Sequence, residues 1–212
     1  HIFGGNQPWD TSKFSAVDDR VRGGQSQSYL TAVDDGRAVR FHGNLDTTTL
    51  GGAGFASQRT NHLEAQPLNF TGVVALRITL DRDPHLPTSS TDDAAHQSKL
   101  YAINLHDGVR ATQPDGRRQS DIEFKYIFRV PPPSADSQPA QPAMTNPAPA
   151  LGSVESFYII DAPLSDFKPY YRGRPLVVNR LLNQSTIYAL DFMMASYFNV
   201  QYGPFSLVIR SV

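Results

Sequence analysis

Apolar and polar residues alternate with a period of two over most of this chain, and this pattern limits the folds that it can adopt. The clearest case runs from Ile122 to Val130, where apolar side chains occupy every even position while Glu123, Lys125 and Arg129 stand opposite. Successive side chains of a strand point to opposite faces, so this spacing predicts a strand with one face in a core. Helical periodicity is nearly absent, and we therefore predict an all-β protein.

Further runs of the same kind predict the rest of the architecture. Val74, Leu76, Ile78 and Leu80 are expected on the core face of one strand, and Asp34–Gly36 predicts a tight hairpin turn. Eight or more strands without intervening helices favour a two-sheet antiparallel jelly-roll sandwich over a closed barrel. The other predicted strands are 26–30, 38–41, 55–59, 101–105, 154–160, 187–194 and 205–209.

The length of 212 residues exceeds that of the commonest domains, but all-β sandwiches reach it as one unit. We therefore predict a single β-sandwich domain over residues 1–212. Two segments interrupt the pattern of strands. Residues 81–98 predict an exposed loop, and residues 131–152 predict a flexible proline-rich insertion, because proline cannot donate a ladder hydrogen bond.

The composition excludes several classes of function. Lysine and arginine number 19 against 20 aspartates and glutamates, and no long run of one sign is present, so we expect no nucleic-acid partner. The absence of cysteine excludes disulfides, thiolate zinc sites and a cysteine nucleophile. No stretch of about twenty apolar residues is available to span a bilayer.

Residues 18–28 hold the densest group of polar side chains. If the segment is extended, Asp18, Arg20 and Arg22 share one face and Asp19 lies on the other, so carboxylate to guanidinium pairing is sterically allowed. The candidate ligand- or partner-binding residues of this segment are Asp18, Asp19, Arg20, Arg22 and Ser26.

Two roles are open for this segment. In the structural one, which we favour, its charges pair and lock the start of a strand against the loop at 171–174, with Gly23 and Gly24 forming a bulge. In the binding one, Arg20 or Arg22 offers planar donors to a carboxylate or a sugar hydroxyl.

A second set of candidates follows aromatic residues late in the chain. Arg172 and Arg174 flank a glycine in a predicted loop just after Tyr170 and Tyr171. Arginine and tyrosine dominate the hot spots of protein interfaces, so Tyr171, Arg172 and Arg174 are candidates for a protein contact. Packing of these long side chains over the rim of the sandwich is the alternative.

Trp9, the single tryptophan, has two interpretations. An exposed indole would give a platform for stacking against a sugar ring. A tryptophan near one end of a chain more often anchors that end to the core, and we favour this interpretation.

Catalytic patterns are missing. Glycoside hydrolysis needs two opposed carboxylates at a defined separation, whereas the Asp-Asp pairs of this chain diverge if extended or lie in turns and loops. No Gly-x-Ser-x-Gly is present, and the cluster Gly51–Gly54 lacks nucleotide-binding spacing. The three Asp-Asp pairs are Asp18-Asp19, Asp34-Asp35 and Asp92-Asp93. We therefore expect no enzymatic activity and no cofactor.

A copper site is the one metal hypothesis that the sequence raises. A free amino terminus at His1, together with its imidazole, chelates copper when another histidine approaches, and copper-dependent oxidation would follow. The other histidines show no recognisable ligand spacing, so we expect no metal. They are His42, His62, His85, His96 and His106.

Three blocks of sequence, in this order and spacing, resemble the complex I intermediate-associated protein family. The first comprises residues 3–5, 8–9, 18–28, 41–45 and 51–57. The second comprises 162–167 and 171–174, and the third 192–194 and 203–207. The most specific part reads Asp-Asp-Arg-Val-Arg-Gly-Gly-x-Ser from Asp18 onward. The proline-rich segment departs from the family pattern, in which a short turn joins those strands.

The resemblance implies a galactose-binding-like jelly roll, related in shape to carbohydrate-binding modules. It implies a non-catalytic domain that binds complex I subunits or assembly factors, and a mitochondrial location, with the cytoplasm as alternative. A module that recognises a glycan is the second hypothesis, and it rests on the same fold and on Trp9, Tyr170 and Tyr171 if they are exposed.

Overall fold

The structure is a computed structural model that describes residues 1–81, 99–109, 111, 114, 119–130 and 157–212. The predicted proline-rich insertion at 131–152 lies outside the described residues, as do residues 82–98 of the predicted exposed loop.

Strands and short 3₁₀ turns make up the regular structure, and no α-helix occurs in the described residues. The strands are β1 (Phe14–Ala16), β2 (Gln27–Val33), β3 (Ala38–Leu45), β4 (Phe55–Thr60), β5 (Ala75–Asp81), β6 (Leu100–His106), β7 (Ile122–Arg129), β8 (Phe157–Pro163), β9 (Lys168–Tyr171), β10 (Arg174–Pro175), β11 (Ala189–Ala195) and β12 (Gly203–Ser211). The turns are η1 (Thr11–Lys13), η2 (Asp19–Arg22), η3 (Asp34–Gly36) and η4 (Leu164–Asp166).

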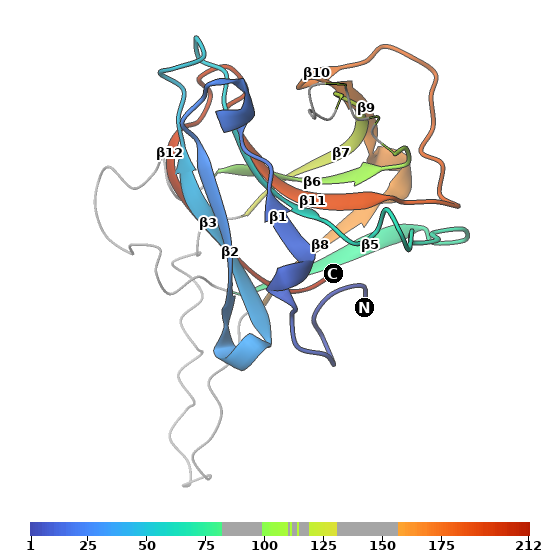
Figure 1. Cartoon of the computed structure of the whole chain (residues 1–212). Helices are drawn as coiled ribbons and strands as arrows, with labels where there is room; N and C mark the ends of the chain where they lie inside the picture. The colour runs from blue at the N-terminus through green and yellow to red at the C-terminus, as the bar shows by residue number, and fades with distance from the viewer. Residues whose placement is uncertain (82–98, 110, 112–113, 115–118, 131–156) are drawn as a thin grey trace, which may run out of the picture.

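The strands form two antiparallel sheets that lie face to face (Figure 1). The seven-stranded sheet has the order β1-β4-β11-β6-β7-β9-β10, and the five-stranded sheet has the order β2-β3-β12-β5-β8. Strands that are neighbours in a sheet are often distant in the chain, as in the pairing of β11 with both β4 and β6. The predicted all-β, two-sheet sandwich is confirmed.

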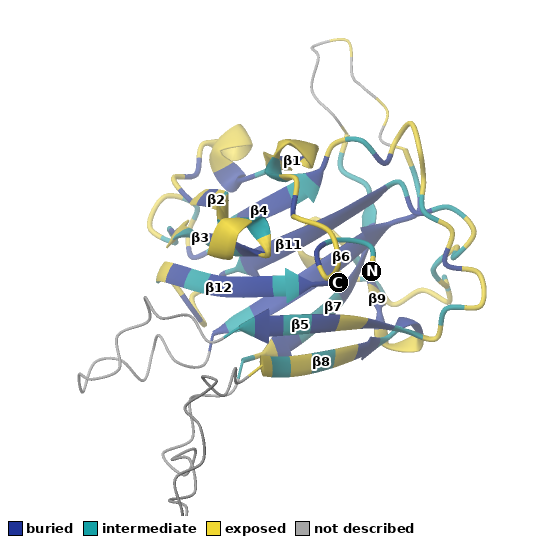
Figure 2. Cartoon of the chain, turned by 90° about the horizontal axis from the view of Figure 1, so that it is seen from below, coloured by how far each residue is buried: buried dark blue, intermediate teal, exposed yellow. Residues whose placement is uncertain are grey.

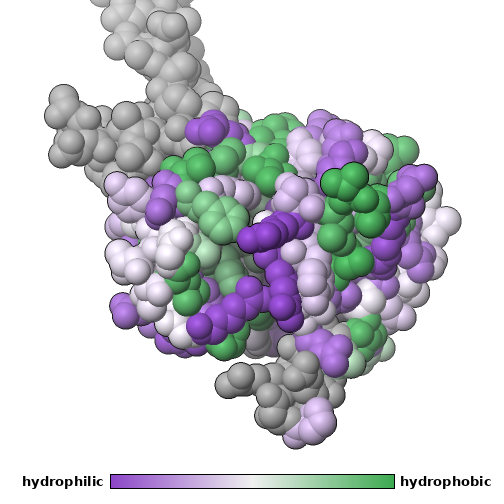
Figure 3. Space-filling view, turned by 90° about the horizontal axis from the view of Figure 1, so that it is seen from above, coloured by the Kyte–Doolittle hydropathy of each residue, from purple (hydrophilic) through white to green (hydrophobic). Residues whose placement is uncertain are grey.

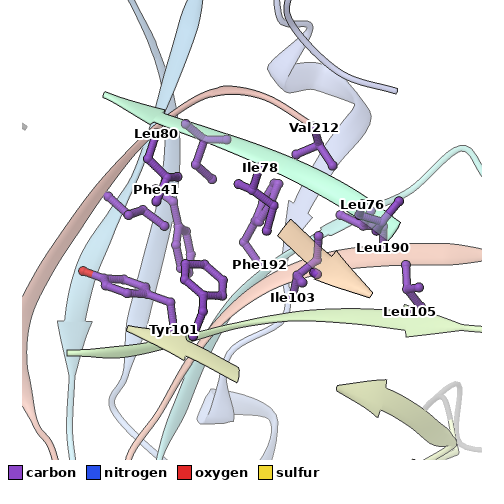
Figure 4. Packing of buried hydrophobic residues seen from close by; sticks show 14 of the residues in the cluster. Phe41, Leu76, Ile78, Leu80, Tyr101, Ile103, Leu105, Leu190, Phe192 and Val212 are labelled. Carbon is purple, nitrogen blue, oxygen red and sulfur yellow. The ribbon is translucent and has the colours of Figure 1, made fainter. Parts of the chain in front are cut away.

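The core lies between the sheets and is apolar. Ile78 and Leu80 of β5 face Ile103 of β6 and Phe192 of β11, and all four side chains are less than 2% exposed. Figure 4 shows these side chains pointing toward one another from the two layers. Buried residues are concentrated on the strands and exposed ones in the connections (Figure 2). Burial of this kind is the main favourable term in folding.

Alternation predicted the inward faces correctly, with one exception. Leu76, Ile78 and Leu80 are buried as expected, but Val74 is 83% exposed because β5 begins only at Ala75. The hairpin turn after β2 is also as predicted, since Asp35 (φ 52°) and Gly36 (φ 81°) adopt the left-handed conformation.

The two ends of the described chain lie side by side (Figure 1). The amide of Ile2 donates to the carbonyl of Val212 at 2.6 Å, and the amide of Val212 donates to the carbonyl of Phe3 at 3.0 Å. Trp9 is 7% exposed, and its Nε1 donates to the carbonyl of Arg210 at 2.9 Å. The predicted anchoring of the first residues by Trp9 is therefore confirmed.

No helix of the described residues has the length and apolar character needed to cross a bilayer.

Candidate functional site

Asp18 is a buried hydrogen-bond acceptor between the two sheets. Its carboxylate accepts from the amide and hydroxyl of Ser28 on β2 at 3.0 and 2.6 Å, and from the amide of Ser57 on β4 at 3.0 Å. Burial raises the pKa of Asp18, and the hydrogen bonds from Ser28 and Ser57 oppose that rise. One carboxylate thus joins the edge strand of the five-stranded sheet to the seven-stranded sheet.

Asp19 makes a parallel set of contacts on the next residue. It accepts from the amide and hydroxyl of Ser26 at 3.0 and 2.7 Å and from the amide of Phe55 at 3.1 Å. Gly24 is required beside it, since a Cβ at that position would lie 2.3 Å from the carboxylate. The side chains of Asp18, Asp19 and Ser26 are therefore engaged in hydrogen bonds within the fold.

The predicted geometry of this segment is wrong in three respects. Residues Asp19–Arg22 form η2 and are not extended, so they do not alternate between two faces. The carboxylates bond to amides and hydroxyls of Ser26, Ser28, Ser57 and Phe55 instead of guanidinium groups, because backbone donors surround them. Gly23 caps η2 with φ 85° and forms no bulge.

The arginines of this segment point to solvent. Arg20 and Arg22 are exposed, and neither forms an ion pair with a described carboxylate. The guanidinium of Arg22 lies over the ring of Phe55, 5.5 Å from its centroid. The predicted contact with residues 171–174 is also wrong, because β9 and β10 lie at the opposite edge of the seven-stranded sheet from β1.

The later candidates form a hairpin at that opposite edge. Arg172 (φ 51°) and Gly173 (φ 76°) make the turn between β9 and β10, as the sequence predicted. The guanidinium of Arg172 lies 5.3 Å from the ring centroid of Tyr171, and its Nε donates to Ser120 Oγ at 3.3 Å. Arg174 is exposed.

Exposed apolar side chains follow the hairpin directly. Val177 and Leu181 are 102% and 84% exposed, and Val178 is also exposed. We call this group the hairpin surface; it consists of Tyr171, Arg172, Arg174, Val177, Val178 and Leu181.

The structure also shows a polar network that sequence reasoning missed. It lies on the outer face, which is the side of the seven-stranded sheet that points away from the core. Asp191 on β11 accepts from Arg59 Nη2 at 2.8 Å and from Asn104 Nδ2 at 2.6 Å, and His106 Nε2 lies 2.9 Å from its carboxylate. The side chains of Asp191 and His106 are 0% and 2% exposed.

The charges of this network fix its protonation. Burial alone raises the pKa of Asp191, but the charge of Arg59 and the hydrogen bond with His106 outweigh burial and hold that pKa below its usual range. Burial, with the charge of Arg59, lowers the pKa of His106, although Asp191 opposes this. The network therefore holds an ionised aspartate and a neutral histidine at neutral pH.

A second buried ion pair lies beside it. Lys125 Nζ is 3.0 Å from Glu123 Oε1, and the ammonium lies 5.2 Å from the ring centroid of Tyr170. Sequence alternation placed Glu123 and Lys125 on a solvated face, but they are 9% and 3% exposed. The position of Glu123 and Lys125 on the face opposite the core was predicted correctly, but their burial was not.

Three buried polar atoms of this region have no hydrogen-bond partner: Asn104 Oδ1, His106 Nδ1 and Tyr197 Oη. Burial raises the pKa of Tyr197, and the charges of Tyr170 and Glu123 add to the rise. Figure 3 looks onto this side of the molecule, where strongly hydrophilic groups cross the middle between hydrophobic ones. Unpaired buried polar atoms are uncommon in folded proteins.

The remaining candidates have structural surroundings. The Trp9 ring stacks on Phe3, at 5.6 Å between centroids, within the core cluster, so an exposed platform for a sugar is contradicted. Among the described residues, no group of three histidine, aspartate or glutamate side chains is arranged to hold a metal ion.

The two packed antiparallel sheets define this protein as a jelly-roll β-sandwich. Residues 3–144 match the model of the family described as complex I intermediate-associated protein 30, and the chain belongs to that family. It is 32% identical over 214 residues to the uncharacterized protein C9E9.15 of Schizosaccharomyces pombe, a match that covers 100% of this chain and 81% of that protein.

Solved structures share the fold at low identity. The family 11 carbohydrate-binding module from Clostridium thermocellum, in complex with a β-1,3-1,4-mixed-linked tetrasaccharide, has a TM-score of 0.50 at 9% identity, covering 94% of this chain and 86% of that one. The family 11 module of cellulase Lic26A-Cel5E of the same organism has a TM-score of 0.49 at 10% identity, covering 98% and 93%. The first likeness shows the fold, as the sequence predicted.

We predict that Asp18→Asn destabilises the protein by about 2–3 kcal/mol, because an amide would turn a donor toward the N–H groups that the carboxylate now accepts. Urea unfolding measures the change. Asp35→Asn, at an exposed turn position, is the matched control and should cost less than about 0.5 kcal/mol. Equal losses in the two variants would show that Asp18 does not join the sheets.

The buried histidine generates a pH prediction. His106 has a lowered pKa when folded, so the unfolded chain binds the proton more readily. The stability is complete above the unfolded pKa of about 6.5 and is lost as the pH falls below it. Melting temperatures at pH 7 and pH 5 should therefore differ less in His106→Gln than in the wild type. An unchanged difference between pH 7 and pH 5 in His106→Gln would contradict the prediction.

Proposed function

We propose that this protein is a non-catalytic protein-binding domain that assists the assembly of mitochondrial complex I. Membership of the complex I intermediate-associated protein 30 family is the observation that carries the proposal. The same membership supports a mitochondrial location, which is part of this proposal. The acidic groups of the outer face support a non-catalytic role, because Asp191 is committed to Arg59 and Glu123 to Lys125.

The hairpin surface is the part of the molecule that we assign to protein contact. Tyrosine and arginine are enriched in interface hot spots, and exposed valine and leucine side chains add apolar area. Arg172 is held in place by Tyr171 and Ser120, so binding would cost little further side-chain entropy. By contrast, Asp18, Asp19 and Ser26 are buried, which leaves them no free donors or acceptors for a partner.

The test is affinity capture from a mitochondrial extract. The wild-type protein should recover complex I subunits or assembly partners, and the double variant Arg172→Ala, Arg174→Ala should recover at least about tenfold less, since loss of a hot spot costs about 2 kcal/mol or more. Arg77→Ala, which removes an exposed arginine from the five-stranded sheet, is the control and should capture as well as the wild type. Absence of these proteins from the wild-type capture would contradict the proposal.

The outer face favours a second candidate function, which is recognition of a glycan. Asn104 Oδ1, His106 Nδ1 and Tyr197 Oη have no partner among the described residues, and a sugar that displaces the side chains covering them would offer hydroxyl donors and acceptors. Tyr170 adds an aromatic surface to the same face. The fold likeness to a module solved with a tetrasaccharide is consistent with this candidate.

Calorimetric titration with the mixed-linked β-1,3-1,4 tetrasaccharide, followed by a glycan array, tests this candidate. Tyr197→Phe removes one hydroxyl and should weaken binding by about fivefold to tenfold, the cost of one hydrogen bond. Tyr29→Phe, on the exposed side of β2, should bind as the wild type does. A lack of saturable binding to every glycan would remove the candidate and leave the protein-binding proposal intact.

A further inference from the structure

Three connections meet at one end of the sandwich. They are η2, the segment 46–54 between β3 and β4, and the segment 196–202 between β11 and β12; Figure 1 shows them together at the top. The amide of Ser196 donates to the carbonyl of Gly54 at 2.9 Å, and the amide of Asn199 donates to the carbonyl of Gly52 at 3.0 Å. We call this region the loop end.

The segment 196–202 carries backbone strain. Tyr197 (φ 46°), Phe198 (φ 58°) and Asn199 (φ 66°) are three successive residues in the left-handed region, which L-residues other than glycine rarely adopt. Ser196 and Gln201 hold the two sides of this turn. Ser196 Oγ donates to the carbonyl of Gly52 at 2.9 Å, and Gln201 Nε2 donates to the carbonyls of Ala195 and Leu100 at 2.6 and 2.8 Å. Strain that is fixed in this way is a pointer to function.

The strained turn directs apolar side chains toward solvent. Phe198, Val200 and Tyr202 are 62%, 68% and 67% exposed, and Val21 on η2 is 69% exposed. Single exposed apolar residues are normal on a protein surface. Here four of them stand on connections that meet at one end of the molecule.

Positive charge accompanies these apolar groups. Arg20 and Arg22 flank Val21, are exposed, and form no ion pair with a described carboxylate. Asp19 is buried under donors, and Asp46 accepts from the hydroxyls of Thr48 and Thr49, which lower its pKa and keep its negative charge. Since neither carboxylate forms an ion pair with Arg20 or Arg22, both guanidinium groups can still meet anions outside the protein, with Arg22 resting on the Phe55 ring.

We propose that the loop end docks on an anionic lipid surface, with Phe198, Val200 and Val21 entering the headgroup region and Arg20 and Arg22 binding lipid phosphates. Interfacial binding of this kind grows with the apolar area buried and with the charge that faces anionic lipids. This is a second surface, distinct from the hairpin surface, and it does not depend on the proposed assembly role.

The backbone of the loop end suits a lipid surface. The amides of Asn199, Val200 and Gln201 already donate to Gly52 and Ser196 at 2.9–3.2 Å, so burial of this turn leaves these donors satisfied. Unsatisfied amides are the main cost of placing backbone in an apolar medium. The apolar side chains also project from separate connections, which fits a flat and deformable lipid surface.

Co-sedimentation with vesicles tests the proposal. The probes are vesicles of phosphatidylcholine alone and of phosphatidylcholine with about a third phosphatidylserine, at physiological ionic strength. We expect the wild-type protein to bind the anionic vesicles preferentially. The double variant Phe198→Ser, Val200→Ser should bind at least about tenfold more weakly. Arg20→Gln, Arg22→Gln should lose about fivefold for each arginine on anionic vesicles.

The matched control is Val74→Ser, Ile159→Ser, which removes two exposed apolar side chains away from the loop end and should bind as the wild type does. Equal urea midpoints would show that all variants are folded. No binding of the wild type to anionic vesicles, or equal losses in the control, overturns the proposal. A captured mitochondrial protein that is lost in the loop-end variant without any vesicle binding also overturns it, and it would assign the surface to a protein instead.

Discussion

The pair of buried carboxylates at Asp18 and Asp19 is the interaction on which the arrangement of the two sheets depends. Each accepts a backbone amide and a hydroxyl from a serine at the start of β2 and a backbone amide from β4, so together they join an edge strand of one sheet to an inner strand of the other. Buried carboxylates are tolerated only where hydrogen bonds replace water, and here six donors do so. The frame that presents the surface loops is set by this contact.

The need to compensate a buried charge also explains the polar network on the outer face. Asp191 is fully buried, and its charge is balanced by Arg59 and by donors from Asn104 and His106. Such an ion pair adds little net stability, because desolvation offsets the attraction, but removal of one partner leaves an uncompensated charge. Asn104 Oδ1 and His106 Nδ1 of this network have no hydrogen-bond partner among the described residues. The network therefore holds its charge in balance while two of its polar atoms stay unpaired.

The sequence predicted the layers better than the sites. Alternation gave the core faces of β5 and β7 correctly, because Leu76, Ile78, Phe124 and Phe128 obey a local rule. Burial of Lys125 could not be predicted, since two of the groups around its ammonium, Met193 of β11 and Tyr170 of β9, come from other strands. The acceptor role of Asp18 was equally hidden, because its donors lie 10 and 39 residues away in the chain. The order of strands, which no local pattern encodes, decides both.

The buried residues that fix the two sheets are different from the exposed residues of the connections, so one sandwich can offer several surfaces to partners. The carboxylates that fix the frame are buried, so they are protected from a partner, while the hairpin surface and the loop end keep arginines that have no described ion pair. Substitution of such an arginine removes a contact without leaving a buried charge, and its effect on stability is small. Substitution of Asp18 or Asp191 acts on stability first, and any loss of binding would follow from loss of the fold. Binding and stability are therefore assigned to different residues of this chain.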